Sequence, residues 1–122
     1  MILNPKLLVV DDERGIVDMI QSYFQTQYDI LTAYSGQEAL KKVACKPDLI
    51  LLDINMPGMD GLALLKQIKQ RHPMLPVIIM TAHSDLDAAV SAYQQGAFDY
   101  LPKPFDIDEA VALVDRAISH YQ

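Results

Sequence analysis

Three apolar runs, each ending at or just before a polar residue, constrain the fold most strongly. They are KLLVV (6–10), DLILLD (48–53) and PVIIMT (76–81). Because their apolar residues are consecutive rather than alternating, we expect both faces of each strand to be buried, as in a parallel sheet covered on two sides. The segments YDILTAY (28–34) and FDYL (98–101) are weaker strand candidates. The sequence therefore predicts a five-stranded parallel sheet.

Segments with helical spacing of apolar residues separate and follow these runs. They cover approximately residues 16–24, 39–43, 62–68, 86–93 and 107–121. In the fourth segment, the expected apolar stripe consists of Leu86, Ala89, Val90 and Tyr93, and Gly96 is a plausible helix end. Regular alternation of strand and helix predicts a doubly wound α/β fold with five helices and right-handed crossovers. We expect residues 1–122 to form one domain without an output domain.

Composition narrows the classes of function. The chain has 122 residues and a formal net charge of −6, so direct binding to nucleic acid is disfavoured. One cysteine, Cys45, excludes an internal disulfide and suits a reducing compartment. No apolar run approaches the roughly 20 residues of a membrane span, and the N-terminus does not resemble a signal peptide. These features predict a cytoplasmic protein without a membrane partner.

Five polar residues fall at the predicted carboxyl ends of the strands, where ligands bind in open α/β sheets. They are Asp11, Asp12, Asp53, Thr81 and Lys103. Three neighbouring carboxylates repel one another, and Lys103 supplies only one positive charge. Oxygen ligands favour Mg²⁺, whereas zinc is disfavoured because no second histidine stands at ligand spacing from His83. A cation, an ammonium and a hydroxyl around one carboxylate would suit Asp53 as a nucleophile toward phosphorus.

Simpler interpretations exist for single residues and for the whole site. Asp11 and Asp12 could be helix N-caps, Thr81 could merely end a strand, and Tyr100 could be a core aromatic. A haloacid-dehalogenase-type hydrolase also uses an aspartyl nucleophile with Mg²⁺, but it needs a second acid where this chain has Asn55. A flavin or nucleotide binder needs a phosphate loop after the first strand, where this chain has acids. An interaction module that does not depend on phosphorylation remains a further alternative.

Four motifs carry a resemblance to a known family. VVDDE (9–13), LLDINMPGMDG (51–61), IIMTAH (78–83) and FDYLPKPF (98–105) resemble the receiver domain of bacterial two-component response regulators. The resemblance implies the flavodoxin-like strand order 2-1-3-4-5 for the sheet. It also implies that Asp53 is the phosphoacceptor and that Mg²⁺ is the cofactor. It implies that Asp12 is a direct metal ligand, that Asp11 acts mainly through metal-bound water, and that the backbone carbonyl of Asn55 completes the metal site.

The same resemblance assigns roles to residues around the phosphoacceptor. Thr81 and Lys103 would contact the phosphoryl oxygens, and Tyr100 would be an aromatic switch residue that turns inward in the active state. The Lys103–Pro104 bond is expected to be cis. His83 and Asn55 stand at positions expected to tune the lifetime of the phosphoryl group.

The resemblance implies a switch rather than a turnover enzyme. A sensor histidine kinase, docking near the first helix, would donate the phosphoryl group, and the receiver would catalyse its own phosphotransfer and autodephosphorylation. The helix at about residues 85–95 would shift, and the face of the fourth helix, fifth strand and fifth helix would control an output such as transcription. A phosphorylation-dependent dimer is compatible with this scheme.

The two parts of the chain resemble different branches of the family. From about Met56 to Gln122 the sequence is similar to receivers of the nitrogen-regulation branch of enteric bacteria, which act with AAA+ ATPase and DNA-binding output domains. The first part, KLLVVDDERGIVDMIQSYF (6–24), resembles a different branch. This difference predicts a chimera, with a natural relative that diverged in one half as the alternative.

Overall fold

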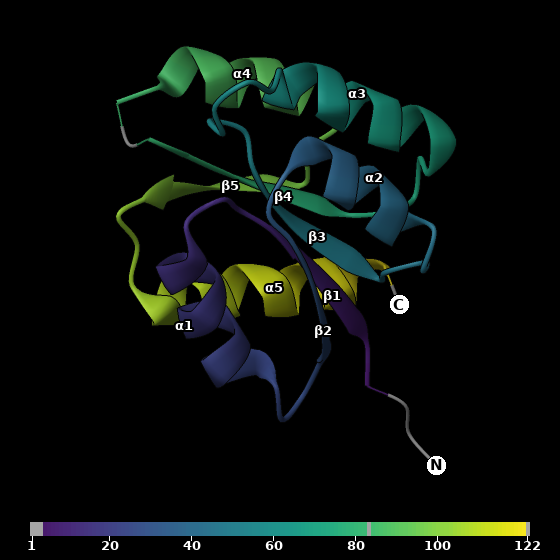
Figure 1. Cartoon of the computed structure of the whole chain (residues 1–122), viewed down its shortest axis with the longest axis vertical. Coiled ribbons are helices and arrows are strands. Elements are labelled where there is room, and N and C mark those ends of the chain that lie inside the picture. The colour runs from purple at the N-terminus through teal and green to yellow at the C-terminus, as the bar shows by residue number, and fades with distance from the viewer. Residues whose placement is uncertain (1–3, 83, 122) are drawn as a thin grey trace.

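The computed structural model describes residues 4–82 and 84–121 and shows a twisted sheet with helices on both faces (Figure 1). The described strands are β1 (Lys6–Val10), β2 (Asp29–Ala33), β3 (Leu49–Asp53), β4 (Val77–Ala82) and β5 (Asp99–Lys103). They lie in the order β2-β1-β3-β4-β5, and all neighbouring strands pair in parallel. The predicted fold class and strand order are confirmed.

The helices form two layers. They are α1 (Arg14–Phe24), α2 (Gly36–Val43), α3 (Gly61–Arg71), α4 (Leu86–Gln94) and α5 (Ile107–Tyr121). Helices α2, α3 and α4 cover one face of the sheet, and α1 and α5 cover the other (Figure 1). None of the helices in the described ranges is long and apolar enough to cross a bilayer.

Strand β3 shows why the apolar runs are continuous. Ile50 and Leu52 pack into the core beneath α2 and α3, whereas Leu49 and Leu51 pack into the core beneath α1 and α5. All four side chains have no exposed surface. Because alternate side chains of a strand point to opposite faces, a central strand of this sheet must be apolar at nearly every position. The burial predicted from the apolar runs is confirmed.

A polar side chain caps the N-terminus of each helix on the face covered by α2, α3 and α4. Ser35, Asp60 and Asp85 each accept a hydrogen bond from the backbone N–H three residues later, at the starts of α2, α3 and α4. These bonds satisfy N–H groups that lack partners within the helix. Gly61, which follows Asp60, lies so close to β3 that an added Cβ would be 2.4 Å from the Cα of Ile54. The start of α3 is thereby held beside the end of β3.

The apolar stripe predicted for α4 is buried only at Ala89. Leu86, Val90 and Tyr93 are 62%, 55% and 43% exposed, while Ala89 and Ala92 face the core. Alanines allow a helix to lie close to a sheet, so the larger side chains are left on the outer surface. Spacing alone did not distinguish these two stripes, because both are apolar and both follow the period of a helix.

Candidate functional site

Three charged residues meet at the carboxyl edge of the sheet, as predicted. Asp11 directly follows β1, Asp53 is the last residue of β3, and Lys103 is the last residue of β5. The sequence had predicted a strand ending at residue 101, but β5 continues to Lys103 because it pairs with β4 up to Ala82. Parallel strands place all three residues at one edge, although Asp11 and Lys103 are 92 positions apart in the chain.

The ammonium of Lys103 is the centre of this site. Its Nζ donates to Asp11 Oδ2 at 2.7 Å, to Glu13 Oε1 at 3.2 Å and to Asp53 Oδ2 at 3.3 Å. Asp11 is fully buried and Asp53 is 3% exposed. Buried carboxylates are costly unless they are paired and hydrogen-bonded. Lys103 therefore makes the burial of both acids tolerable.

Burial perturbs the ionisation of the site. Loss of solvent raises the pKa of Asp11 to about 6, with a smaller contribution from the charge of Asp53, although hydrogen bonds from Lys103 and the Glu13 amide act in the opposite direction. Burial alone would lower the pKa of Lys103, but its interactions with Asp11, Asp53 and Glu13 outweigh it and raise the pKa. The site therefore favours an added positive charge over an added negative one.

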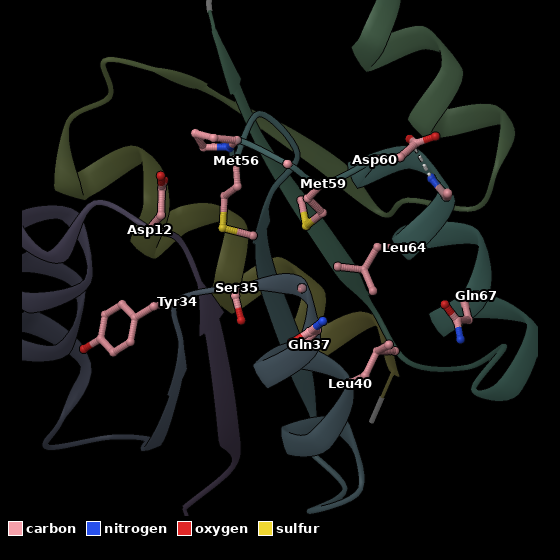
Figure 2. A pocket seen from close by; sticks show the side chains of 14 residues that line it. Asp12, Tyr34, Ser35, Gln37, Leu40, Met56, Met59, Asp60, Leu64 and Gln67 are labelled. Carbon is pink, nitrogen blue, oxygen red and sulfur yellow. Dashed lines mark hydrogen bonds between the residues drawn. The ribbon is translucent and has the colours of Figure 1, made fainter.

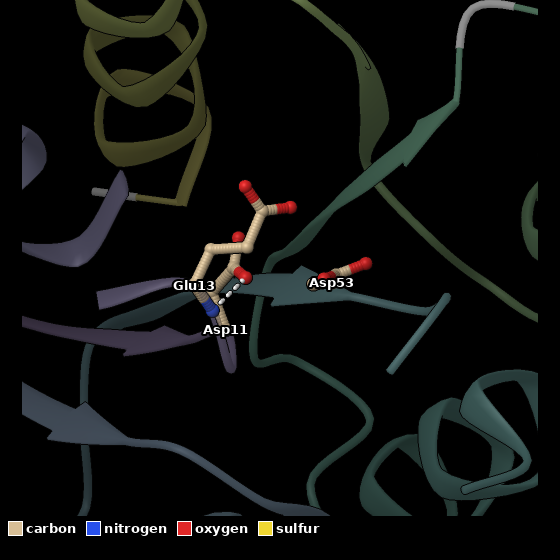
Figure 3. Close-up of side chains that lie close together, drawn as sticks. All are labelled: Asp11, Glu13 and Asp53. Carbon is tan, nitrogen blue, oxygen red and sulfur yellow. Dashed lines mark hydrogen bonds between the residues drawn. The ribbon is translucent and has the colours of Figure 1, made fainter. Parts of the chain in front are cut away.

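The acidic oxygens suit a hard divalent cation. Carboxylate oxygens of Asp11, Glu13 and Asp53 lie within 4.8 Å of one another. Figure 3 shows Asp11 and Glu13 side by side in the loop after β1, with Asp53 at the end of the nearby β3. Mg²⁺ prefers oxygen ligands of this kind. Glu13 was not predicted as part of the site, although its place directly after two aspartates was visible in the sequence.

Asp12 lies apart from this cluster. It is exposed, and among the described residues the closely spaced oxygens come from Asp11, Glu13 and Asp53. Asp12 does line the cavity that contains Asp53 and Lys103. Its assignment as a direct metal ligand stays a prediction, as does the role of the Asn55 carbonyl.

Asn55 connects Asp53 to Thr81. The backbone N–H of Asn55 donates to Asp53 Oδ1 at 2.8 Å, and its side-chain Nδ2 donates to Thr81 Oγ1 at 3.1 Å. Thr81 is 1% exposed and stands at the carboxyl end of β4, next to β3. The structure thus brings the predicted hydroxyl to the site, and the side-chain contact with Asn55 is one that sequence reasoning missed.

Tyr100 lies near the start of β5, three residues before Lys103. Its side chain is half-buried against the core beneath α2, α3 and α4. The ring packs edge-on against the ring of Tyr93 from α4, with 6.0 Å between centroids. Its function as a switch stays a prediction. The expected cis bond between Lys103 and Pro104 is confirmed, and His83 lies outside the described residues.

A cavity of about 640 Å³ opens over Asp53. Asp12, Glu13 and Lys103 supply its charged side, and the rest of its wall includes Ile16, Met19, Pro57, Pro104 and Phe105. A second cavity of about 530 Å³ lies between α2 and α3 and is lined by Met56, Met59 and Leu64 (Figure 2). Asp12 borders both cavities. The first cavity gives a ligand access to the largely buried Asp53.

Comparison with known proteins gives a consistent result. The family profile of the response regulator receiver domain matches residues 7–115. The chain is 71% identical over 116 residues to the DNA-binding transcriptional regulator NtrC of Klebsiella pneumoniae, covering 93% of this chain and 25% of that protein. It is 42% identical to the transcriptional regulatory protein ZraR of Escherichia coli O157:H7, covering 96% of this chain and 27% of that protein. The chain thus spans about a quarter of the length of these relatives.

Solved structures also resemble the chain. The solution structure of the apo receiver domain of nitrogen regulatory protein C is 68% identical, with a TM-score of 0.87 and coverage of 97% of each chain. NtrX from Brucella abortus is 36% identical, with a TM-score of 0.91 over 98% of this chain and 28% of that one. The resemblance to the nitrogen-regulation branch is confirmed, while the chimeric origin stays a prediction.

Proposed function

The chain belongs to the response regulator receiver family, and we propose that it is a phosphorylation-operated switch whose phosphoacceptor is Asp53. The observation that supports this role best is the position of the Asp53 carboxylate. It is almost fully buried at a strand end, yet it borders an open cavity and faces the Lys103 ammonium at 3.3 Å. A carboxylate in these surroundings is accessible to phosphorus and has a cation beside it for the transferred charge.

The proposed transfer begins with a phosphohistidine of a sensor kinase. A carboxylate oxygen of Asp53 attacks phosphorus, an O–P bond forms, and the P–N bond to imidazole breaks. The electron pair of that bond stays on the imidazole nitrogen, which takes a proton from solvent. The Asn55 amide, at 2.8 Å from Asp53 Oδ1, holds the carboxylate in place during attack.

Asp11, Asp12, Asp53 and the Asn55 carbonyl are the groups that would hold Mg²⁺ in this proposal. A bound Mg²⁺ would neutralise charge on the phosphoryl oxygens and lower the repulsion among the acids. The oxygen-rich cluster around Asp11 and Asp53 supports this cofactor, because it leaves a net negative site even with Lys103 present. Lys103 would move its ammonium from the carboxylates to a phosphoryl oxygen.

Thr81 provides the connection to conformational change. Its hydroxyl now accepts a hydrogen bond from Asn55, and in the phosphorylated state it would donate to a phosphoryl oxygen instead. That movement would vacate space near β4 and β5 into which the ring of Tyr100 can turn. Phosphorylation would thereby shift the population between two arrangements of α4 and β5.

The proposed output lies on the face of α4, β5 and α5. Because two relatives are named as transcriptional regulators, we propose that this receiver controls transcription through AAA+ ATPase and DNA-binding domains, in the cytoplasm. The kinase would dock beside α1, near Ile16 and Met19, which form one wall of the cavity over Asp53. Dimerisation after phosphorylation belongs to the same proposal.

Asp53→Asn tests the assignment of the phosphoacceptor. The wild-type chain, incubated with acetyl phosphate and Mg²⁺, should gain one phosphoryl group detected by intact mass, and the variant should gain none. Asp18→Asn is the matched control, because Asp18 is an exposed acid on α1 that lies outside the charged cluster. Phosphorylation of the Asp53→Asn chain at the wild-type level would show that the assignment is wrong.

A further inference from the structure

Lys103 is shared by three carboxylates that differ sharply in exposure. The side chain of Asp11 has no exposed surface and that of Asp53 is 5% exposed, whereas that of Glu13 is 61% exposed. Asp11 and Asp53 already have roles in the proposed function. Glu13 has none, although its Oε1 lies 3.2 Å from the Lys103 ammonium, slightly closer than Asp53 Oδ2.

The local geometry shows that Glu13 reaches toward Lys103 rather than toward its own helix. Glu13 is the N-cap residue of α1, but its side chain makes no capping hydrogen bond. Its backbone N–H donates to Asp11 Oδ1 at 2.9 Å, which fixes the base of the side chain beside the buried acid. The carboxylate then extends over Asp11 at the open side of the cluster (Figure 3).

We propose that Glu13 is a positioning residue, which retains the Lys103 ammonium beside Asp53 when a divalent cation takes over the oxygens of Asp11 and Asp53. This inference rests on the proposed function. Lys103 and the cation compete for the same buried oxygens, since these are the oxygens that the ammonium now contacts. Once Lys103 gives up those contacts, Glu13 is the remaining carboxylate of the described cluster within its reach.

Retention matters because a lysine side chain is long and flexible. A free Lys103 would gain rotamer entropy by extending into solvent, and its ammonium would then have to be recovered for each phosphoryl transfer. The ion pair with Glu13, at the mouth of the cavity, would keep the ammonium close to Asp53 and make this recovery faster. Since the Glu13 side chain is largely exposed, the pair resembles an exposed ion pair, for which loss of one partner changes an equilibrium by about two- to fivefold.

A double-mutant cycle between Glu13 and Lys103 tests the proposal. The variants are Glu13→Gln, Lys103→Ala and the combination, with Asp18→Asn as a control that removes the same charge from α1. Two quantities are measured on the full chain: the initial rate of phosphorylation by acetyl phosphate at saturating Mg²⁺, and the Mg²⁺ affinity by titration calorimetry. Because calorimetry does not require phosphorylation, the cycle can still be measured if the Lys103→Ala chain is phosphorylated too slowly to follow.

The effect of Glu13→Gln should depend on the presence of Lys103. Glu13→Gln should lower both the rate and the Mg²⁺ affinity by about two- to fivefold in the wild-type background and should change neither in the Lys103→Ala background. Asp18→Asn should leave both unchanged. Equal losses with and without Lys103 would overturn the proposal, because Glu13 would then act directly on the metal or the donor.

Two further outcomes are equally decisive. If Glu13→Gln matches the wild type in both measurements, the ion pair has no role in retention and the proposal is wrong. If the wild-type chain itself accepts no phosphoryl group, the proposed function fails, but the Mg²⁺ affinities of the wild type and the three variants of the cycle still decide whether Glu13 acts through Lys103.

Discussion

Helices α1 and α4 pack against the same sheet in contrasting ways. Helix α1 buries Val17, Ile20 and Phe24, each at most 2% exposed, whereas α4 buries only Ala89 and Ala92. A fully buried Val, Ile or Phe side chain contributes roughly 1.5–3 kcal/mol, and an alanine much less. Apolar packing against the sheet therefore holds α1 firmly and α4 only weakly.

Polar contacts partly compensate for the weak apolar packing of α4. Tyr93 Oη donates to Asp99 Oδ1 at 2.5 Å, and Arg116 Nη2 from α5 donates to Asp99 Oδ2 at 2.9 Å. The Tyr93 ring also meets the ring of Tyr100. A helix held by a few half-exposed polar contacts can be repositioned at low cost, which is what a switch element requires. The contrast supports the proposal that α4 is the element that moves, while α1 stays anchored.

The largest expected effect comes from removing an anchor of α1. Phe24→Ala should lower the free energy of unfolding by about 3–5 kcal/mol, because it leaves a cavity in the core beneath α1 and α5. Urea unfolding followed by circular dichroism measures this loss. Val90→Ala on α4 is the comparison variant and should change stability by less than about 0.5 kcal/mol. Similar losses for both variants would break the contrast between the helices.

The loop that precedes α1 and the helix α4 should also respond to different ranges of pH. In the metal-free chain the raised pKa of Asp11, about 6, means that the folded state binds more protons than the unfolded state above the ordinary value of 3.8. The free energy of unfolding should therefore fall as pH rises from about 4 to 6. Asp11→Asn should remove this fall and raise stability at pH 7 by roughly 1–3 kcal/mol.

The attachment of α4 should titrate only in alkali. Burial, followed by the hydrogen bond to Asp99, raises the pKa of Tyr93 to about 12 from 10.0, so its contribution to stability should be lost between those values. Unfolding curves recorded across the pH range, with Asp11→Asn beside the wild type, measure both windows. An unchanged slope between pH 4 and 6 in Asp11→Asn would contradict the assignment to Asp11.

A smaller effect is expected from cutting the polar attachment of α4. Tyr93→Phe keeps the ring contact with Tyr100 but removes the hydrogen bond to Asp99, and it should cost about 0.5–1.5 kcal/mol. The loss should be local, so amide hydrogen exchange should quicken in 86–94 and not in 14–24. Tyr23→Phe on α1, at a 60% exposed position, is the control. Faster exchange in both helices would show that α4 is not a separate unit.

The smallest effect on stability should come from the outer surface of α4. Leu86 and Val90 are more than half exposed, so Val90→Ser should change the free energy of unfolding by less than about 0.5 kcal/mol. If the α4 face is the output surface, the same variant should weaken self-association of the phosphorylated chain, measured by sedimentation. Unchanged self-association would remove Val90 from the proposed surface.

Much of the site could be predicted because it follows from the order of the strands. Asp11, Asp53, Thr81 and Lys103 stand at or next to the ends of apolar runs, and a parallel sheet brings such ends together whatever the details of packing. The contacts of Asn55 with Thr81 and of Glu13 with Lys103 were not predicted. They depend on side-chain directions in two loops, which no periodic pattern encodes.

The sequence by itself determined the sheet and the edge at which the charged residues gather, because continuous apolar runs must be buried on both faces and parallel strands share a direction. Only the tertiary structure decided which stripe of α4 faces the core, because two apolar stripes of the same period compete and close packing against β4 selects the alanines. The tertiary structure also decided that the Lys103 ammonium contacts three acids. Two of these acids, Asp11 and Glu13, lie 90 or more positions from Lys103 in the chain, so the contacts depend on how distant segments pack together.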